Sequence, residues 1–110
     1  MAQAYYSILG QVQPAAATAT DLYTVGVTKQ SIISTIAVCN QAATAASFNI
    51  AVRKNGTSLT SYQYIAYQVT IAANDTTSLT WGITLNAGDV ITVQASTANV
   101  SFSVFGQEIY

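Results

Sequence analysis

The sequence predicts an all-β fold: a single-domain antiparallel β-sandwich, jelly-roll-like, of about eight strands over residues 1–110. Three observations lead to this prediction. Apolar and polar residues alternate with a period of two, turn-forming residues recur between these runs, and no stretch shows the spacing of an amphipathic helix. The alternating residues are mainly Val, Ile, Thr, Tyr and Phe, which fit a pleated, half-buried surface.

The expected strands follow the alternation along the chain. The clearest case is the last, where Val100, Phe102 and Val104 alternate with serines. Strands at the edge of a sheet recruit partners, so the first and last strands are candidates for pairing with a neighbour, and residues 1–14 form an N-terminal strand or arm. The eight expected strands are 4–12, 21–26, 30–40, 46–54, 58–71, 76–85, 89–96 and 100–109.

Two turn motifs separate strands in the second half of the chain. "RKNGTS" contains Asn55 and Gly56, and this pair is typical of a type I′ hairpin turn because both central residues need positive φ. "LNAGD" contains Asn86, Gly88 and Asp89. An aspartate side chain can accept hydrogen bonds from nearby backbone N–H groups, so Asp89 is interpreted as a structural turn residue.

The composition restricts the partners of the chain. Charged residues make up 6% of it and the net charge is −1, so no basic field is available to hold nucleic acid. Apolar residues reach 51% without forming a run long enough to span a membrane, and "MAQAYYSILGQ" lacks the features of a secretory signal. A surface with so little charge indicates a protein that sits against neighbours.

The residues that catalyse reactions are scarce. There is no histidine, and the one cysteine, Cys39, lies in an apolar run and is expected to be a buried thiol in a protein folded in a reducing cytosol. The carboxylates Asp21, Asp75, Asp89 and Glu108 are far apart in sequence, each at a strand end or turn. We therefore expect no enzyme activity, no metal site and no cofactor.

Tyrosines give the best candidate for a contact surface. Within 58–71, Tyr62 and Tyr64 are expected on the exposed face, and the pair fits ordinary cross-strand packing, a subunit interface or a ligand platform. Arg53 and Lys54 precede the Asn-Gly turn and are expected to be exposed near a hairpin tip. The expected interface residues are therefore Tyr62, Tyr64, Arg53 and Lys54. The face expected to be buried carries Ile65, Tyr67, Val69 and Ile71.

Two resemblances to known families follow from these motifs. "LNAGDVITV" followed by "FSVFGQEI" resembles the last two strands of trimeric jelly-roll modules of the tumour-necrosis-factor-like and complement-like types. Almost the whole chain, through "DLYTV", "ISTIAVCNQAATAASFNIAVRKNG" and "YIAYQVTIAANDTTSLTWGITLNAGDVITVQASTANVSFSVFGQEI", is similar to small virion proteins of tailed bacteriophages, notably cyanophages. The family pattern "LYTVPAG" is replaced by "LYTVGV" at 22–27, so this turn departs from it.

The second resemblance implies a β-sandwich subunit of the phage virion, assembled in the cytoplasm of the bacterial host. The expected role is a capsid decoration (cement) protein, a homotrimer that binds other virion proteins such as the major capsid protein. A place in the tail, neck, baseplate or a fibre is the alternative. A carbohydrate-binding module using Tyr62, Tyr64 or Trp81 is a further alternative, weakened because Trp81 is in phase with Leu79 and Ile83 and is expected in the core.

Overall fold

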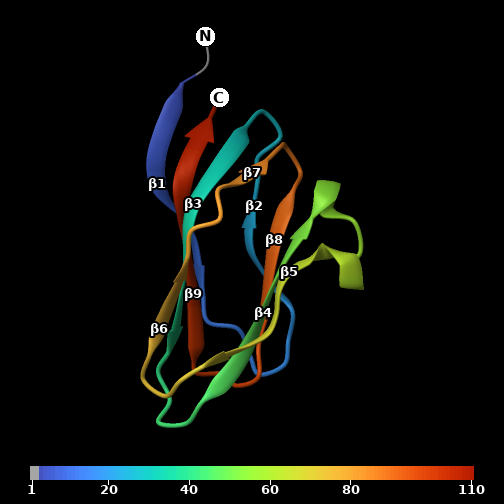
Figure 1. Cartoon of the computed structure of the whole chain (residues 1–110). Coiled ribbons are helices and arrows are strands. Elements are labelled where there is room, and N and C mark those ends of the chain that lie inside the picture. The colour runs from blue at the N-terminus through green and yellow to red at the C-terminus, as the bar shows by residue number, and fades with distance from the viewer. Residues whose placement is uncertain (1–2) are drawn as a thin grey trace.

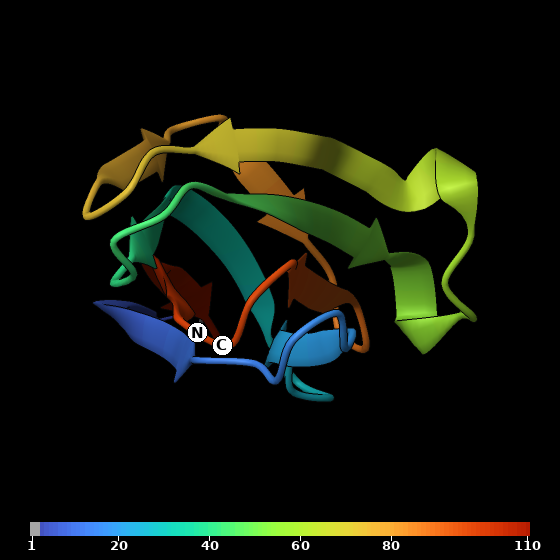
Figure 2. The ribbon, with the colours of Figure 1, turned by 90° about the horizontal axis from the view of Figure 1, so that it is seen from below.

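The computed structural model describes residues 3–110, which form two antiparallel β-sheets packed face to face (Figures 1 and 2). No helix in this part of the chain is both long and apolar enough to cross a membrane. Two short 3₁₀ turns, η1 (Lys54–Gly56) and η2 (Ser61–Gln63), lie between the fourth and fifth strands. The strands are β1 (Ala4–Val12), β2 (Thr20–Thr24), β3 (Gln30–Asn40), β4 (Ala46–Arg53), β5 (Tyr64–Ile71), β6 (Thr76–Leu79), β7 (Ile83–Leu85), β8 (Val90–Ala95) and β9 (Val100–Ile109).

The strand order is that of a jelly roll. One sheet runs β1-β9-β3-β6, with β7 also paired to β3, and the other runs β2-β8-β4-β5. β6 pairs with the second half of β3 and β7 with its first half, so these two short strands share one position at the edge of the sheet. The predicted fold class, an antiparallel sandwich of the jelly-roll type, is confirmed.

The core lies between the two sheets and follows the alternation of the sequence. Phe48 of β4 and Phe102 of β9 are fully buried, and their rings meet edge to face at 6.1 Å. Val100 and Val104 lie on the same buried face of β9 as Phe102. Burial of each such side chain contributes about 1.5–3 kcal/mol, so the facing apolar rows hold the sheets together.

The prediction of one long strand at 58–71 is wrong for its first part. Residues 61–63 form η2, and β5 begins only at Tyr64. The pairing of β4 with β5 also shifts near Gln68, whose φ is +50° and whose N–H donates to the Asn49 side chain. This bulge changes which face the side chains occupy, so Ile65 and Tyr67, expected in the core, are 38% and 60% exposed.

The strand expected at 76–85 is interrupted, and this exposes Trp81. β6 ends at Leu79 and β7 begins at Ile83, with Gly82 between them at a φ of +63°. Trp81 therefore leaves the alternation of its neighbours and is 50% exposed, which makes its expected place in the core wrong. Glycine adopts this left-handed conformation at little cost, and the break occurs there.

Two further expectations need correction. β9 is an interior strand, paired with β1 on one side and β3 on the other, so residues 100–109 do not form an edge. Cys39 is half-buried, on the face of β3 that points away from the core, and is therefore not a buried thiol. Of the N-terminal segment 1–14, residues 1 and 2 lie outside the described part, and β1 forms the edge of its sheet.

Candidate functional site

The connection between β4 and β5 projects from one side of the sandwich (Figures 1 and 2). It opens with a tight turn in which Asn55 and Gly56 both have positive φ, and the N–H of Thr57 donates to the carbonyl of Lys54 at 3.1 Å. These are the features of a type I′ turn. The turn does not join two strands directly, because η2 follows before β5 begins.

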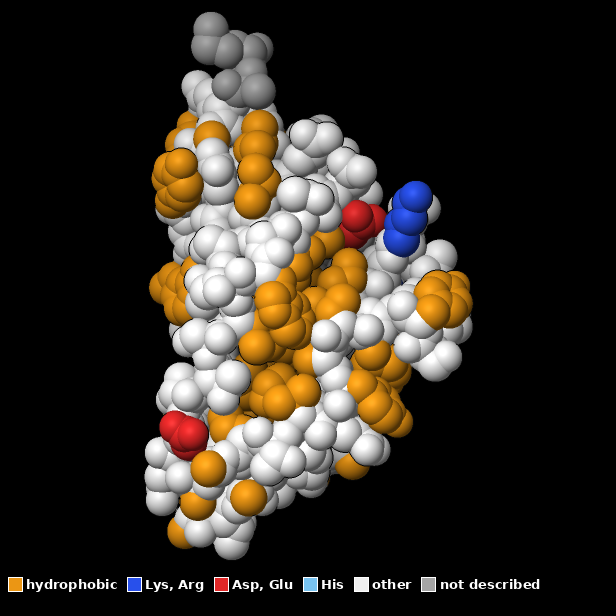
Figure 3. Space-filling view, viewed as in Figure 1, with side chains coloured by type: hydrophobic (Ala, Val, Ile, Leu, Met, Phe, Trp, Pro, Cys, Tyr) orange, Lys and Arg blue, Asp and Glu red, His pale blue; other side chains and the backbone are white. Residues whose placement is uncertain are grey.

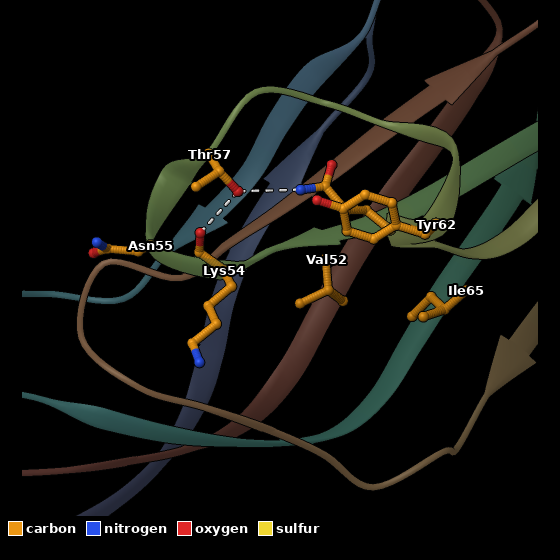
Figure 4. Close-up of a pocket in the computed structure, with 7 residues that line it drawn as sticks. Val52, Lys54, Asn55, Thr57, Tyr62 and Ile65 are labelled. Carbon is orange, nitrogen blue, oxygen red and sulfur yellow. Dashed lines mark hydrogen bonds between the residues drawn. The ribbon is translucent and has the colours of Figure 1, made fainter.

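This connection encloses a hollow of about 520 Å³, which we call the loop hollow (Figure 4). Apolar contact comes from the side chains of Val52 and Ile65 and the ring of Tyr62, and polar contact from hydroxyl, amide and ammonium groups. Tyr62 is 84% exposed, so its ring is available to a partner. The lining residues are Val52, Lys54, Asn55, Thr57, Tyr62, Gln63 and Ile65.

The buried side chain of Gln63 orders the part of the connection that lines the loop hollow. The amide of Gln63 donates to the hydroxyl of Thr57 at 3.2 Å and accepts from the N–H of Thr60 at 2.7 Å. The Thr57 hydroxyl in turn donates to the carbonyl of Lys54 at 3.0 Å, and Figure 4 shows Thr57 between these two partners. Because its amide is satisfied, Gln63 can be buried at 7% exposure and order the connection.

Asp89 ties the same connection to the turn before β8. Its carboxylate accepts the N–H of Asn55 at 2.8 Å and the N–H of Asn86 at 2.9 Å. Gly88 has a φ of +87°, and a Cβ there would come within 2.7 Å of the Asn55 side chain. The turn residues named from the sequence, Asn55, Gly56, Gly88 and Asp89, thus lie together, where two turns from different parts of the chain meet.

Arg53 is not exposed at the hairpin tip, in contrast to the expectation. Its side chain is 17% exposed and forms an ion pair with Asp21 at 2.9 Å. Its Nε donates to the hydroxyl of buried Thr92 at 2.9 Å, and Nη1 donates to the carbonyls of Gly56 and Thr57 at 3.2 and 3.0 Å. We call Arg53, Asp21 and Thr92 the braced face, because one guanidinium joins β4, β2, β8 and the turn.

The two tyrosines expected as an exposed pair are separated. Tyr62 lies on η2, whereas Tyr64 opens β5 and is only half-exposed. Tyr64 packs instead against Tyr67, with ring centroids 5.0 Å apart at an angle of 63°. The alternation in the sequence places Tyr67 on the buried face, so it was not expected to be exposed. The bulge at Gln68 moves its side chain to the exposed face.

A second polar cluster joins β2, β3 and β9. The hydroxyl of Tyr23 donates to Glu108 at 2.7 Å and lies 2.6 Å from the Ser31 hydroxyl, while Lys29 approaches Glu108 at 3.7 Å. Burial raises the pKa of Tyr23 to about 12; the Ser31 hydrogen bond lowers it, and the hydrogen bond and charge of Glu108 raise it. This cluster crosses between the sheets and is a structural contact.

The chemistry available at these sites is that of binding. The loop hollow offers apolar contact, amide and hydroxyl groups and the ammonium of Lys54, which has no acidic partner among residues 3–110. In the same described range, no group of three or more cysteine or acidic side chains is placed to hold a metal ion.

Comparisons with known proteins find a likeness to solved structures. No family model and no curated protein matches the chain. A chain from the structure of infectious bursal disease virus, strain Gx, matches 99% of this chain with a TM-score of 0.55 at 10% identity. A chain of the T13 particle of that virus gives 0.54 at 9% identity, and one of its VP2 subviral particle 0.52 at 11%, each over 98% of this chain. This chain covers 37%, 30% and 32% of those three chains, about a third of their length. These likenesses show a shared fold.

Large hydrophobic side chains remain exposed at several places on the described part of this fold. In the view of Figure 3, hydrophobic side chains gather over the upper part of β1 and along the strip between β7 and β5. On β1, Tyr6 and Ile8 are 83% and 58% exposed. Ile32, on β3 of the same sheet, is 40% exposed. We call Tyr6, Ile8 and Ile32 the β1 surface. Exposed apolar groups that gather in this way are typical of protein contact sites.

Proposed function

We propose that this chain is a structural subunit of a virus particle, acting through contacts with its own copies and other particle proteins and catalysing no reaction. The observation that carries the proposal is the jelly-roll strand order, shared over 98–99% of the chain with chains of infectious bursal disease virus particles. Identity of 9–11% makes this a likeness of architecture, so the role is inferred from architecture and surface together.

The surface supports a role in assembly. Four of the seven charged side chains form the pairs Arg53–Asp21 and Lys29–Glu108, and Asp89 is used by backbone N–H groups. Large apolar side chains are exposed instead, on the β1 surface and near the loop hollow. A neutral, apolar surface suits repeated contacts between subunits, because each copy buries the same patches in a symmetric assembly.

The more specific form of the proposal is a capsid decoration (cement) subunit of a tailed bacteriophage. Such a subunit binds the assembled shell, as a homotrimer over the major capsid protein, and stabilises it by mass action. It is then a component of the virion, assembled in the cytoplasm of the bacterial host. A place in the tail, neck, baseplate or a fibre uses the same chemistry and differs only in the partner.

A second candidate, a carbohydrate-binding module, is favoured by one observation. Sugar platforms need exposed aromatic rings, and Tyr62, Tyr67 and Trp81 are 84%, 60% and 50% exposed. From the sequence, this candidate was weakened because Trp81 was expected in the core. The exposure of Trp81 removes that argument. The loop hollow beside Tyr62 adds amide and hydroxyl groups that can hydrogen-bond a sugar.

The first experiment is light scattering coupled to size exclusion, with and without purified phage heads. Self-association together with co-migration with heads supports a decoration subunit. Self-association without head binding moves the proposal to the tail. A chain that stays monomeric and ignores particles contradicts the structural role; a glycan array, with Tyr62→Ala and Trp81→Ala as matched variants, then tests the carbohydrate candidate.

A further inference from the structure

The outer edge of β1 carries backbone groups that nothing in the described chain covers. Among the strands of residues 3–110, β1 pairs with β9 on one side and has no strand on the other. Gln3 and Tyr110 exchange both backbone hydrogen bonds, so they form a hydrogen-bonded pair, and the register continues without a shift from Ala4 to Ile8. Because such pairs alternate in antiparallel sheets, the N–H and C=O groups of Ala4, Tyr6 and Ile8 point outward.

The residues of this edge lack the features that usually prevent an edge strand from pairing with another chain. Natural edge strands carry lysine, proline or inward charges that block pairing with another chain. Residues 4–8 read "AYYSI", with no charge and no proline. An exposed edge without charge or proline favours the addition of another strand.

The available length of this edge is limited at one end. The pairing of β1 with β9 shifts between Ile8 and Gly10, so the strand bulges at Leu9. β2 then lies so close to β1 that a Cβ at Gly10 would collide with the carbonyl oxygen of Leu22. A partner strand can therefore align only with residues 4–8.

The side chains of Tyr6 and Ile8 lie on the outer face of the sheet. Tyr6 lines a shallow hollow together with Ile32, Ser34, Gly106 and Gln107. Ile8 pairs in register with Phe105 of β9, which is half-buried on the same outer face. The edge and the β1 surface are therefore continuous, so a strand added to the edge also contacts apolar side chains.

We propose that the occupant of this edge is β1 of a second copy of the chain, antiparallel, with the two-fold axis at Tyr6. In this register Tyr6 faces Tyr6 of the second copy, and small Ala4 faces large Ile8 on each side. Each copy supplies three outward N–H and three outward C=O groups, which match one another. The absence of charge means that self-pairing brings no like charges together, as the symmetry otherwise would.

This inference rests on the proposed role in assembly and identifies one contact of that assembly. The pairing joins the β1-β9-β3-β6 sheets of two copies into one continuous sheet. A two-fold contact closes after two copies, so a trimer, where formed, uses another surface.

The register predicts a specific cross-link. A hydrogen-bonded pair places the two Cα atoms about 5.5 Å apart, within the range that a disulfide spans. In a Cys39→Ser background, Tyr6→Cys is expected to give a covalent dimer on mild oxidation, seen on non-reducing gels. Gln11→Cys, on the same strand beyond the bulge, is the matched control and should remain uncross-linked. Because the Cβ atoms of a hydrogen-bonded pair lie up to about 5.5 Å apart, a short bismaleimide is used beside oxidation. Equal cross-linking of both variants, or no cross-link of Tyr6→Cys by either reagent in a self-associating protein, overturns the register.

A backbone variant tests the hydrogen bonds themselves. Tyr6→Pro removes an outward N–H and leaves the pairing with β9 intact, because the N–H of Tyr6 does not point toward β9. Through the symmetry two bonds are lost, which should weaken self-association about tenfold or more. Tyr6→Ala removes the same ring and keeps the N–H, and thermal unfolding checks that both variants fold.

The outcomes separate this inference from the proposed function. Self-association that is unchanged in Tyr6→Pro and in Tyr6→Lys contradicts the β1 contact and leaves the structural role standing. Cross-linking of Tyr6→Cys to a different particle protein, instead of to itself, identifies another occupant and overturns the self-pairing. A wild-type chain that neither self-associates nor binds particles contradicts both.

Discussion

The braced face and the β1 surface differ in their charged groups: the first is built around a guanidinium with many hydrogen bonds, and the second is exposed and carries no charge. On the braced face, the guanidinium of Arg53 joins Asp21, Thr92 and two turn carbonyls, and it is mostly buried. On the β1 surface, Tyr6 and Ile8 are exposed and no charged side chain lies within residues 4–8. Five of the seven charged side chains of the chain thus help to hold the fold together, and the neutral surface is left for partners.

The largest effect is expected from breaking the braced face. Arg53→Met leaves the hydroxyl of Thr92 and the two turn carbonyls without their guanidinium donor, and it leaves Asp21 with only the hydrogen bond from the Thr92 hydroxyl at 3.1 Å. Because Asp21 is half-exposed and keeps part of its hydration, the free energy of unfolding should fall by about 2–3 kcal/mol. Urea denaturation measures this change.

The matched variant on the other region is Ile8→Thr, which keeps a β-branched residue in β1 and removes apolar surface. Its stability should change by less than about 0.5 kcal/mol, because the side chain is exposed. Lys54→Met, next to Arg53 in sequence and without an acidic partner among residues 3–110, should be similarly mild. Equal losses in all three variants would remove the contrast between the two regions.

A smaller effect is expected at the junction of the two turns. Asp89→Ala removes the acceptor of two backbone N–H groups, those of Asn55 and Asn86, and should lower the free energy of unfolding by about 1–2 kcal/mol. Asp75→Ala is the control, because within residues 3–110 its carboxylate accepts only the N–H of Thr76 beside it. A loss at Asp75 as large as that at Asp89 would contradict a special role for the turn junction.

The cluster around Tyr23 predicts a dependence of stability on high pH. Burial raises the pKa of Tyr23 to about 12 in the folded chain, above the ordinary value of 10.0. The folded state then keeps its proton where the unfolded state loses it, so the contribution is fully present below pH 10 and is lost as pH rises toward 12. Urea denaturation at pH 9 and 11.5 should therefore show a smaller loss for Tyr23→Phe than for the wild type.

A small effect is also expected at Trp81. Since it is half-exposed, Trp81→Ser should cost less than about 1 kcal/mol, against the roughly 3–5 kcal/mol of a buried tryptophan. It is the only tryptophan of the chain, so its fluorescence reports on this position alone. The emission should be quenched readily by acrylamide in the folded protein, and strong protection from quenching would place the ring in the core.

The alternation was a good guide wherever a strand runs straight. It predicted the buried rows of β4 and β9, with Phe48 and Phe102 at their centres, and six of the eight expected strands lie within two residues of the observed ones. It failed at Gln68 and at Gly82, where a bulge and a break change the phase. The bulge at Gln68 follows from pairing with a distant strand and has no mark in the local pattern. Gly82 is a glycine inside a strand pattern, a local sign that the alternation alone does not use.

The sequence by itself determined the class of fold, the places of the turns and the small number of reactive groups, because period-two alternation and turn chemistry are properties of neighbouring residues. Only the tertiary structure decided which strands lie at an edge and which side chains are exposed. Arg53 reads as an exposed basic residue until Asp21 and Thr92 come beside it from other strands. β1 becomes an open edge only because β9, and not β1, lies between two strands of the sheet.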